Sequence, residues 1–255
     1  KEQSVRRDVR RDFRFSLNLE VPEFPDLEGE LNEYFLSAAW ASLVGEVFAD
    51  GSATYRIRIR PTGEDLTYTV EGGTFGRVPF GRFVLFFFVY KGDLFGEYDF
   101  SLNDARKLGR ELGGVRIYLD DFRVFPYGDP KDDWLRLNEM KARRTPQLLG
   151  RTIGLERAAG LPVSERPELL LPGTNQLFGI VEISRFDQPQ IQINVSRERL
   201  VENEAFKELR SFVQLGIYWM TVQYSRVTLA EREARRQERV LNAASKAEDA
   251  EALLR

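Results

Sequence analysis

The chain has 255 residues, of which 42% are hydrophobic and 12% aromatic, enough apolar material to bury a substantial core. Its 37 Lys and Arg residues nearly balance its 40 Asp and Glu residues, and a net charge of -3 gives no overall field that would attract nucleic acid. The chain has no Cys and no His, which excludes disulfides, thiolate nucleophiles, cysteine-ligated zinc and Ser-His-Asp catalysis, and we expect no metal site.

Residues 1–39 are expected to form a basic segment followed by a connector. Six basic residues stand against three acids in residues 1–14 at about helical spacing, which favours a solvated helix face. Pro22 and Pro25 then mark the connector. The sequence has no apolar run of membrane-spanning length and no signal-peptide pattern, so we expect a soluble, cytoplasmic protein without a membrane partner.

Two strands are expected next, from Trp40 to Phe48 and from Thr54 to Arg60, because Asp50-Gly51 between them is a strong hairpin signal. Alternation along the second strand separates an apolar face from a face that carries Arg56, Arg58 and Arg60. That second face is either an ordinary wet surface, which we favour, or a basic stripe. The apolar run 83–90 is rich in β-formers and predicts a central strand covered on both faces.

A helix is expected from Ser101, which can cap it, to Leu112, before the pair Gly113-Gly114. A hairpin follows, with strands 115–118 and 122–125 joined across Asp120-Asp121. Asp132 and Asp133 are then expected to open a helix that ends before Pro146.

Residues 145–175 contain four prolines and are expected to be rich in loops. Strands are expected at 178–183 and 191–195, followed by a long helix from about Glu202. The apolar positions of this helix follow 3.6-residue spacing, which predicts one buried face: Phe206, Leu209, Val213, Ile217, Met220 and Tyr224. Beyond Arg226 the composition shifts to Ala, Glu and Arg, so the helix should continue outward.

We therefore predict an α/β (α+β) chain in three parts, a basic segment and connector (1–39), a mixed-sheet domain with packing helices (40–224) and a C-terminal helical extension (225–255).

The heptapeptide 194–200, N-V-S-R-E-R-L, is the most informative stretch for function. It is expected to end a strand and to place Arg197 where a helix begins. A guanidinium stays ionised and can bind two phosphate oxygens at once. Asn194 and Ser196 could hold the turn through side-chain hydrogen bonds, and Glu198 would favour the first helical turn. The competing interpretation is a plain helix start with a solvated arginine.

Two other charged groups could carry chemistry. Residues 136–157 hold six basic residues against two acids and could bind the phosphate of a nucleotide or of a nucleic-acid backbone, although we favour a solvated loop and helix face. The group Asp129, Asp132 and Asp133 could suggest a metal, but an acidic helix start accounts for it. The sequence therefore offers phosphate contacts rather than metal ligands.

The heptapeptide resembles the N-x-S-R-E-x-L element in the middle domain of the ninety-kilodalton heat-shock chaperones. Three further strings look like the transducer region of bacterial GHKL ATPases (gyrase, heat-shock chaperone, histidine kinase, MutL) of the Microrchidia-like branch. They are 114–134 (G-V-R-I-Y-L-D-D-F-R-V-F-P-Y-G-D-P-K-D-D-W), 179–184 (G-I-V-E-I-S) and 202–206 (E-N-E-A-F). The resemblance covers residues 114–219, under half of the chain.

This resemblance implies a transducer-type domain with a split βαβ unit. It also implies that Arg197 acts catalytically by contacting the γ-phosphate of ATP bound in a separate domain. The other expected ATP-contacting residues are Asn194 and Ser196 beside it and one of Lys141, Arg143 and Arg144.

The acidic-asparagine helix that binds Mg²⁺ in GHKL ATPases and their D-x-G-x-G adenine turn do not occur in the sequence. ATP and Mg²⁺ are therefore expected to be held mainly by an ATP-binding domain upstream of Lys1, and the chain is not expected to hydrolyse ATP alone. It would relay the nucleotide state to its C-terminal helices, within a homodimer, to a DNA or protein client. The alternative is a non-enzymatic nucleic-acid- or protein-binding module with a helical dimerisation arm.

Overall fold

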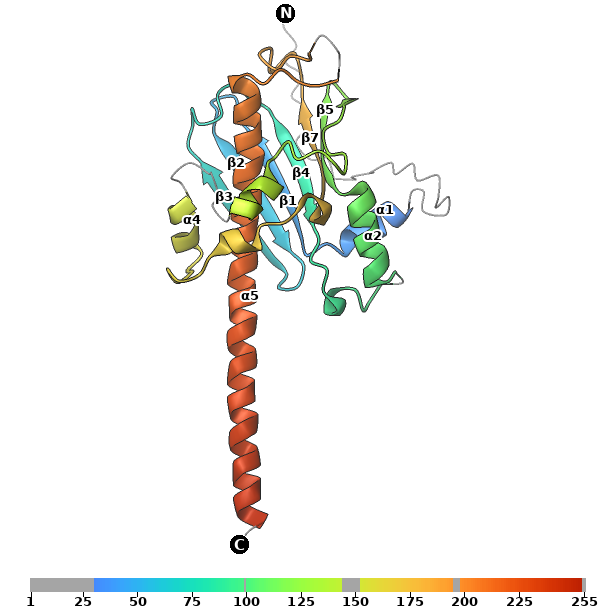
Figure 1. Cartoon of the computed structure of the whole chain (residues 1–255). Coiled ribbons are helices and arrows are strands. Elements are labelled where there is room, and N and C mark those ends of the chain that lie inside the picture. The colour runs from blue at the N-terminus through green and yellow to red at the C-terminus, as the bar shows by residue number, and fades with distance from the viewer. Residues whose placement is uncertain (1–29, 99, 144–151, 195–197, 254–255) are drawn as a thin grey trace, which may run out of the picture. The chain divides into compact units, whose positions relative to one another are not determined.

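The computed structural model describes residues 30–98, 100–143, 152–194 and 198–253, with only the backbone described for 30–33, 93, 152–153 and 244–253 (Figure 1). The chain divides into two compact units, Lys1–Ala39 and Trp40–Arg255. The described part of the first unit contains the helix α1 (Glu30–Ser37). In its last turn, Ser37 Oγ donates a hydrogen bond to the carbonyl of Tyr34 at 2.6 Å. Among all the residues described, no helix has the length and apolarity needed to span a membrane.

The second unit is built on a mixed sheet. Within the described part of the chain the sheet has seven strands in the order β3-β2-β1-β4-β7-β5-β6. Their bounds are β1 (Ala41–Val47), β2 (Ala53–Ile59), β3 (Glu64–Val70), β4 (Arg82–Phe87), β5 (Gly114–Leu119), β6 (Phe122–Val124) and β7 (Leu177–Ile183). With its packing helices and a long C-terminal helix, the unit confirms the α/β class predicted from the sequence.

The sheet is antiparallel except where β5 and β7 pair in parallel, from Gly114 opposite Phe178 to Leu119 opposite Ile183. A parallel pair needs a crossover connection, and residues 125–176 supply it with α3 (Leu137–Arg143), α4 (Thr152–Ala158), η3 (Pro167–Leu170) and η4 (Thr174–Gln176). Because β5 and β7 are direct neighbours, no strand separates this pair, whereas the family resemblance implied a split unit.

The first hairpin forms as predicted, with β1 and β2 in antiparallel register. Gly51 adopts a φ of +75°, which costs a glycine little, and the carboxylate of Asp50 accepts hydrogen bonds from the backbone and hydroxyl of Ser52 at 2.9 and 2.6 Å. In β2, Tyr55 and Ile57 are buried, while the arginines between and after them point to the other face. Local sequence signals are therefore sufficient to form this hairpin.

The predicted central strand is β4, the fourth of the seven strands. Its side chains alternate between complete burial, as at Phe83 and Leu85, and partial burial, as at Val84. The expectation of full cover on both faces is therefore wrong. Helix α5 (Glu204–Leu253) lies across one face of the sheet, and an antiparallel sheet can leave its other face partly open to water.

Helix α2 (Leu102–Leu112) begins as predicted, because Ser101 and Asp104 form a reciprocal capping box. The next hairpin, β5–β6, also forms as predicted. Asp120 and Asp121 occupy its turn with φ values of +50° and +68°, the conformation of a tight two-residue hairpin. A short helix, η2 (Gly92–Leu94), precedes α2.

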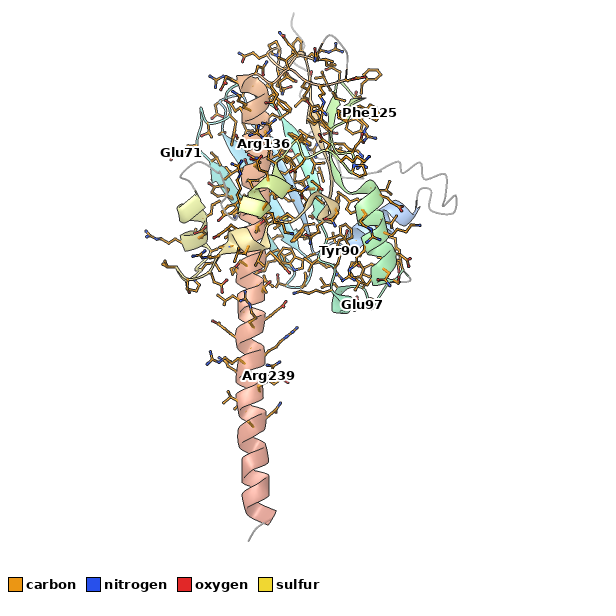
Figure 2. All side chains as sticks on the ribbon, viewed as in Figure 1. Glu71, Tyr90, Glu97, Phe125, Arg136 and Arg239 are labelled. Carbon is orange, nitrogen blue, oxygen red and sulfur yellow. The ribbon has the colours of Figure 1, made fainter. Side chains whose placement is uncertain are left out.

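Helix α5 is continuous over 50 residues. Its predicted apolar positions are buried except Tyr224, which is partly buried, and the hydroxyl of Tyr55 on the sheet donates to the carbonyl of Phe212 at 3.0 Å. Burial on α5 extends to Val227, and the described side chains from Glu231 to Ala243 are exposed. Around Arg239 the side chains stand clear of any other element of this unit (Figure 2).

Candidate functional site

The heptapeptide is described at Asn194 and from Glu198 to Leu200, and Val195, Ser196 and Arg197 lie outside the described residues. Its two flanks are joined by hydrogen bonds. The backbone N–H of Asn194 donates to the carbonyl of Arg199 at 2.6 Å, and Ile193 forms an isolated antiparallel bridge with Leu200. The described flanks of the heptapeptide therefore pair with each other in a short β-clasp.

This clasp corrects two predictions. Residues 191–194 do not form a strand of the sheet, and Glu198 is not in the first turn of a helix. Helix α5 begins at Glu204, because Asn203 accepts a hydrogen bond from the backbone N–H of Phe206 at 3.0 Å and acts as the cap. The long helix predicted from about Glu202 is therefore confirmed, and Asn203 is the sequence signal for its start.

Tyr127 holds the clasp from the side. Its buried hydroxyl accepts a hydrogen bond from the backbone N–H of Leu200 at 3.0 Å. The Tyr127 ring contacts Trp134 and Phe206, with centroid distances of 5.8 and 5.5 Å. Trp134 is fixed in turn, because its indole N–H donates to the carbonyl of Val115 at 2.7 Å. Residue-type reasoning did not single out Tyr127, although it lies in the P-Y-G string that carries the resemblance.

A second tie links the β5–β6 turn to the segment after β7. Asp120 accepts hydrogen bonds from the backbone of Arg185 at 3.0 Å and from its guanidinium at 2.6 Å. These hydrogen bonds, chiefly the one from the guanidinium, hold the pKa of Asp120 below its ordinary value. The backbone N–H of Asp120 donates to the carbonyl of Ile183 at 3.0 Å, so the turn is fixed against the end of β7.

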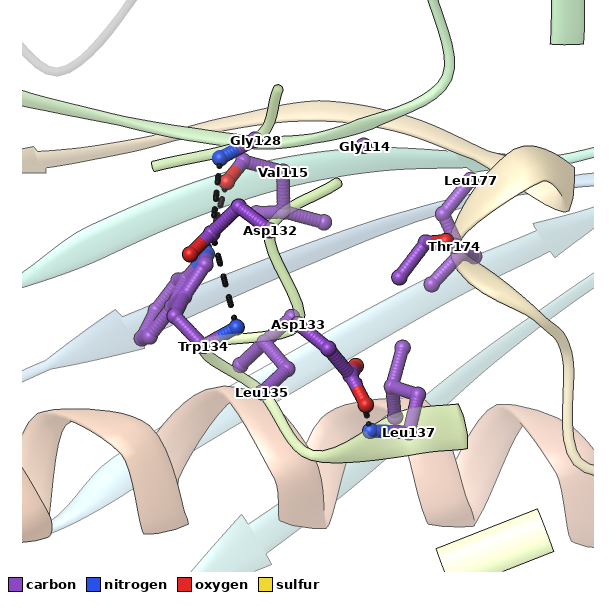
Figure 3. Close-up of a pocket in the computed structure, with 10 residues that line it drawn as sticks. All are labelled: Gly114, Val115, Gly128, Asp132, Asp133, Trp134, Leu135, Leu137, Thr174 and Leu177. Carbon is purple, nitrogen blue, oxygen red and sulfur yellow. Dashed lines mark hydrogen bonds between the residues drawn. The ribbon is translucent and has the colours of Figure 1, made fainter. Parts of the chain in front are cut away.

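The acidic group is structural in its described contacts. Asp132 accepts from the backbone N–H groups of Gly128 and Trp134 at 3.1 and 3.4 Å, and Asp133 accepts from Leu137 at 2.8 Å at the start of α3 (Figure 3). Burial raises the pKa of both carboxyl groups. The adjoining cavity of about 10 Å³ has room for one water molecule rather than a nucleotide.

Asp129 forms an ion pair with Arg123 instead of joining the other two acids. Within the described residues, no group of three or more acids could hold a metal ion. The acidic helix start that we favoured is present in part, since Asp133 caps α3, but the helix begins four residues later than Asp133.

The predicted second phosphate contact falls on the last turn of α3. Lys141 and Arg143 are exposed there, Arg143 pairs with Glu139 at 2.8 Å, and Arg144 lies outside the described residues. The segment before α3 contacts α5 through Gln214, whose amide donates to the carbonyl of Leu135 at 2.8 Å. Gln214 is about 15 Å along the axis from the first residue of α5, at 1.5 Å per residue. Trp134, next to Leu135, stacks with Phe206 in the first turn of α5 at a centroid distance of 5.9 Å, so the segment before α3 contacts α5 from its first turn onward.

The arginines of β2 do not form an unpaired basic stripe. Arg56 pairs with Glu46 and Arg58 pairs with Asp65, each at 3.0 Å. Arg60 donates to a backbone carbonyl at 3.0 Å and lies over the ring of Tyr98, 5.6 Å from its centroid. The favoured interpretation of this face as an ordinary polar surface agrees with these contacts.

The geometry therefore centres on one structure, the clasp at 193–200 with its anchor Tyr127 and the cap of α5. No family model matches the chain, and the search of curated proteins returned no match.

Proposed function

We propose that this chain is the transducer region of a GHKL-type ATPase, in which Arg197 contacts the γ-phosphate of ATP held by an upstream ATP-binding domain. One observation carries the proposal. The strings that resemble the family are far apart in sequence, yet they pack into one unit through Tyr127, Arg185 and Leu200. A shared functional unit requires such contacts, and their presence supports the proposal.

The clasp suits the proposed role of Arg197. In the sequence, Arg197 stands three residues after Asn194 and three before Leu200, and both of these flanks are held by hydrogen bonds. In general, a side chain carried between two fixed points loses less conformational freedom on binding than one on an unanchored segment. A guanidinium can then neutralise charge that develops on a transferring phosphoryl group.

The same arrangement gives a route for relaying nucleotide state. Three residues separate Leu200 from Glu204, and Asn203 among them caps α5 and also donates to the carbonyl of Gln190 at 2.6 Å. A displacement of the loop would therefore reach the first turn of α5. Such a relay requires two arrangements that ATP stabilises differently. The exposed extension beyond Glu231 is our proposed contact for a second copy in a homodimer or for a DNA or protein client. A cytoplasmic location follows from the same proposal, since the ATPase would use the nucleotide pool there.

The alternative function, a nucleic-acid-binding module, has less support. It calls for a broad basic surface that includes Arg56 and Arg58, and both of these arginines are paired with acids. Pairing cancels the local field that would attract a phosphate backbone.

The test measures steady-state ATP hydrolysis by the full-length protein that contains both this chain and the proposed upstream ATP-binding domain. Arg197→Ala should lower kcat by at least about 10²-fold with little change in ATP affinity, because the group acts where charge develops in the transition state. Arg197→Lys should restore part of the rate, since an ammonium lacks the planar fork. Arg199→Ala is the matched control and should stay near wild type. Equal turnover of Arg197→Ala and wild type, with matching melting curves, would reject the catalytic role.

The chain by itself should bind ATP negligibly, because the sequence lacks the family's adenine and Mg²⁺ elements. Isothermal titration of the chain with Mg-ATP measures this directly. Binding tighter than about 10 μM, worth roughly 7 kcal/mol, would contradict the assignment of the pocket to another domain.

A further inference from the structure

Four arginines lie along one side of the exposed part of α5. They are Arg232, Arg235, Arg236 and Arg239, and we name them the arginine stripe. A helix has 3.6 residues per turn, so positions i, i+3, i+4 and i+7 share one face. All four side chains are exposed, and around Arg239 the helix stands clear of the rest of this unit (Figure 2). The stripe is therefore one continuous basic surface that a large partner can reach.

Most of this basic charge has no acidic partner in the described part of the chain. Arg232 lies 3.6 Å from Glu165 of the crossover. The guanidinium groups of Arg235, Arg236 and Arg239 form no ion pair or hydrogen bond with any other described residue. The helical repeat places the glutamates of this stretch to either side of the stripe, at positions 231, 233 and 238. Three guanidinium groups are thus open to an anion.

Within the helix these arginines repel one another. Arg232 and Arg236 stand four residues apart, as do Arg235 and Arg239, and like charges at this spacing destabilise a helix. A chain of anions bound along the stripe would remove this repulsion. The same ligand would therefore satisfy the guanidinium groups and stabilise the helix that carries them.

The spacing of the stripe fits a nucleic-acid backbone. From Arg232 to Arg239 the helix rises by about 10.5 Å at 1.5 Å per residue, so the four charges follow one another at about 3.5 Å. Each strand of a DNA duplex carries one phosphate per about 3.4 Å of its axis. An arginine stays ionised and can bind two phosphate oxygens at once. The stripe therefore matches a phosphate backbone in both charge and repeat.

Two other polyanionic partners fit this surface less well. A lipid surface requires a broad apolar face beside the basic one, whereas Val240 and Leu241 are the large hydrophobic residues exposed on the described part of the extension. Single-stranded nucleic acid binds through aromatic side chains on which its bases stack, and residues 228–253 contain no aromatic residue. The backbone of a duplex is the better match.

We propose that the arginine stripe binds the phosphate backbone of double-stranded DNA without reading its sequence. The inference rests on the proposed function for its place in a relay, since it makes DNA the client of the extension, but the binding itself needs no ATP. The contact is confined to α5, so it differs from a broad basic surface that includes Arg56 and Arg58. The competing partner is an acidic protein.

The test is fluorescence anisotropy of a short labelled DNA duplex, titrated with the chain at several salt concentrations. The stripe variant carries Arg235→Gln, Arg236→Gln and Arg239→Gln, because glutamine removes the charge and remains a good helix former. The matched control removes three positive charges that are paired with acids elsewhere, through Arg56→Gln, Arg58→Gln and Lys107→Gln. Circular dichroism and melting curves check that both variants keep the fold.

The wild-type chain should bind the duplex at low salt. Its log affinity should fall by about 3–4 for each tenfold rise in salt concentration, since each neutralised phosphate contributes about 0.9. The stripe variant loses three contacts, so this slope should shrink by about 2.7 and the affinity at low salt should drop at least about tenfold. The control variant, with the same net charge as the stripe variant, should bind about as tightly as wild type.

Three results would overturn the inference. They are the absence of wild-type binding at low salt, equal weakening of the stripe and control variants, and displacement of the duplex by polyglutamate as effectively as by unlabelled duplex of equal charge. The last result would assign the stripe to an acidic protein. The turnover of Arg197→Ala decides the proposed ATPase function separately, because no nucleotide enters this titration.

Discussion

Gly216→Ala probes how closely α5 approaches the sheet. Gly216 lies in the helix, where alanine is favoured by about 1 kcal/mol. A methyl group there would lie 2.7 Å from Cζ of Phe83 and 2.9 Å from Cδ1 of Tyr55, well inside the separation of about 3.5–4.0 Å at which carbon atoms attract. Neither ring can withdraw easily, because both are fully buried and the Tyr55 hydroxyl is bonded to Phe212.

The two effects oppose each other. Overpacking a core typically costs about 1–3 kcal/mol, and the helix gains about 1 kcal/mol from alanine. We expect a net loss of about 1–2 kcal/mol, since the opposing rings are held on several sides. For a domain of this size, 1 kcal/mol corresponds to about 2–4 °C in Tm.

Urea denaturation and thermal melts of the chain measure the effect, with Gly154→Ala as the matched control. Gly154 also lies in a helix, and a methyl group there would meet no atom within 4 Å, so we expect a gain of about 0.5–1 kcal/mol. The destabilisation by Gly216→Ala should shrink in a Phe83→Leu background, because the shortened side chain relieves the clash. A Gly216→Ala chain as stable as wild type or more so would refute the close approach of helix and sheet.

Three further changes test other parts of the structure. Tyr127→Phe leaves the buried N–H of Leu200 without its acceptor, so urea denaturation should show a free energy of unfolding lower by about 1–3 kcal/mol. An unchanged free energy of unfolding would show that the Tyr127 hydroxyl does not anchor the clasp. Burial raises the pKa of Asp132, so the stability that this group contributes is greatest below its ordinary pKa of 3.8 and is lost as the pH rises through the folded pKa. The free energy of unfolding of Asp132→Asn should therefore increase relative to that of wild type as the pH rises. A constant difference between the two across a pH series would contradict this. A chain truncated after Ala230 should keep a cooperative thermal melt. A chain ending at Tyr224 loses the buried residues Ser225 and Val227 and the ion pair between Arg226 and Glu64 of β3, so it should melt at a lower temperature. Equal melting temperatures for the two truncated chains would show that these contacts add nothing to stability.

The candidate site was predictable in part. The strings around Tyr127 and Leu200 were recognisable in the sequence, but their mutual contact depends on residues 73 positions apart. The strand predicted at 191–195 and the helix start predicted at Glu198 were wrong for the same reason, because the clasp pairs the two flanks of the loop with each other. Arg197, Ser196 and Arg144 lie outside the described residues, so their roles remain predictions.

By itself, the sequence determined the elements whose causes are local. Alternation at Tyr55 and Ile57, the turn at Asp50-Gly51 and the cap at Ser101 each depend on a few neighbouring residues, and the structure confirms all three. Tertiary structure alone decided that β7 inserts between β4 and β5, because strand order depends on which edges meet. Tertiary structure also explains why the glycine at 216, which is unfavourable in an isolated helix, is accommodated, because a methyl group there would lie 2.7 Å from the Phe83 ring and 2.9 Å from the Tyr55 ring.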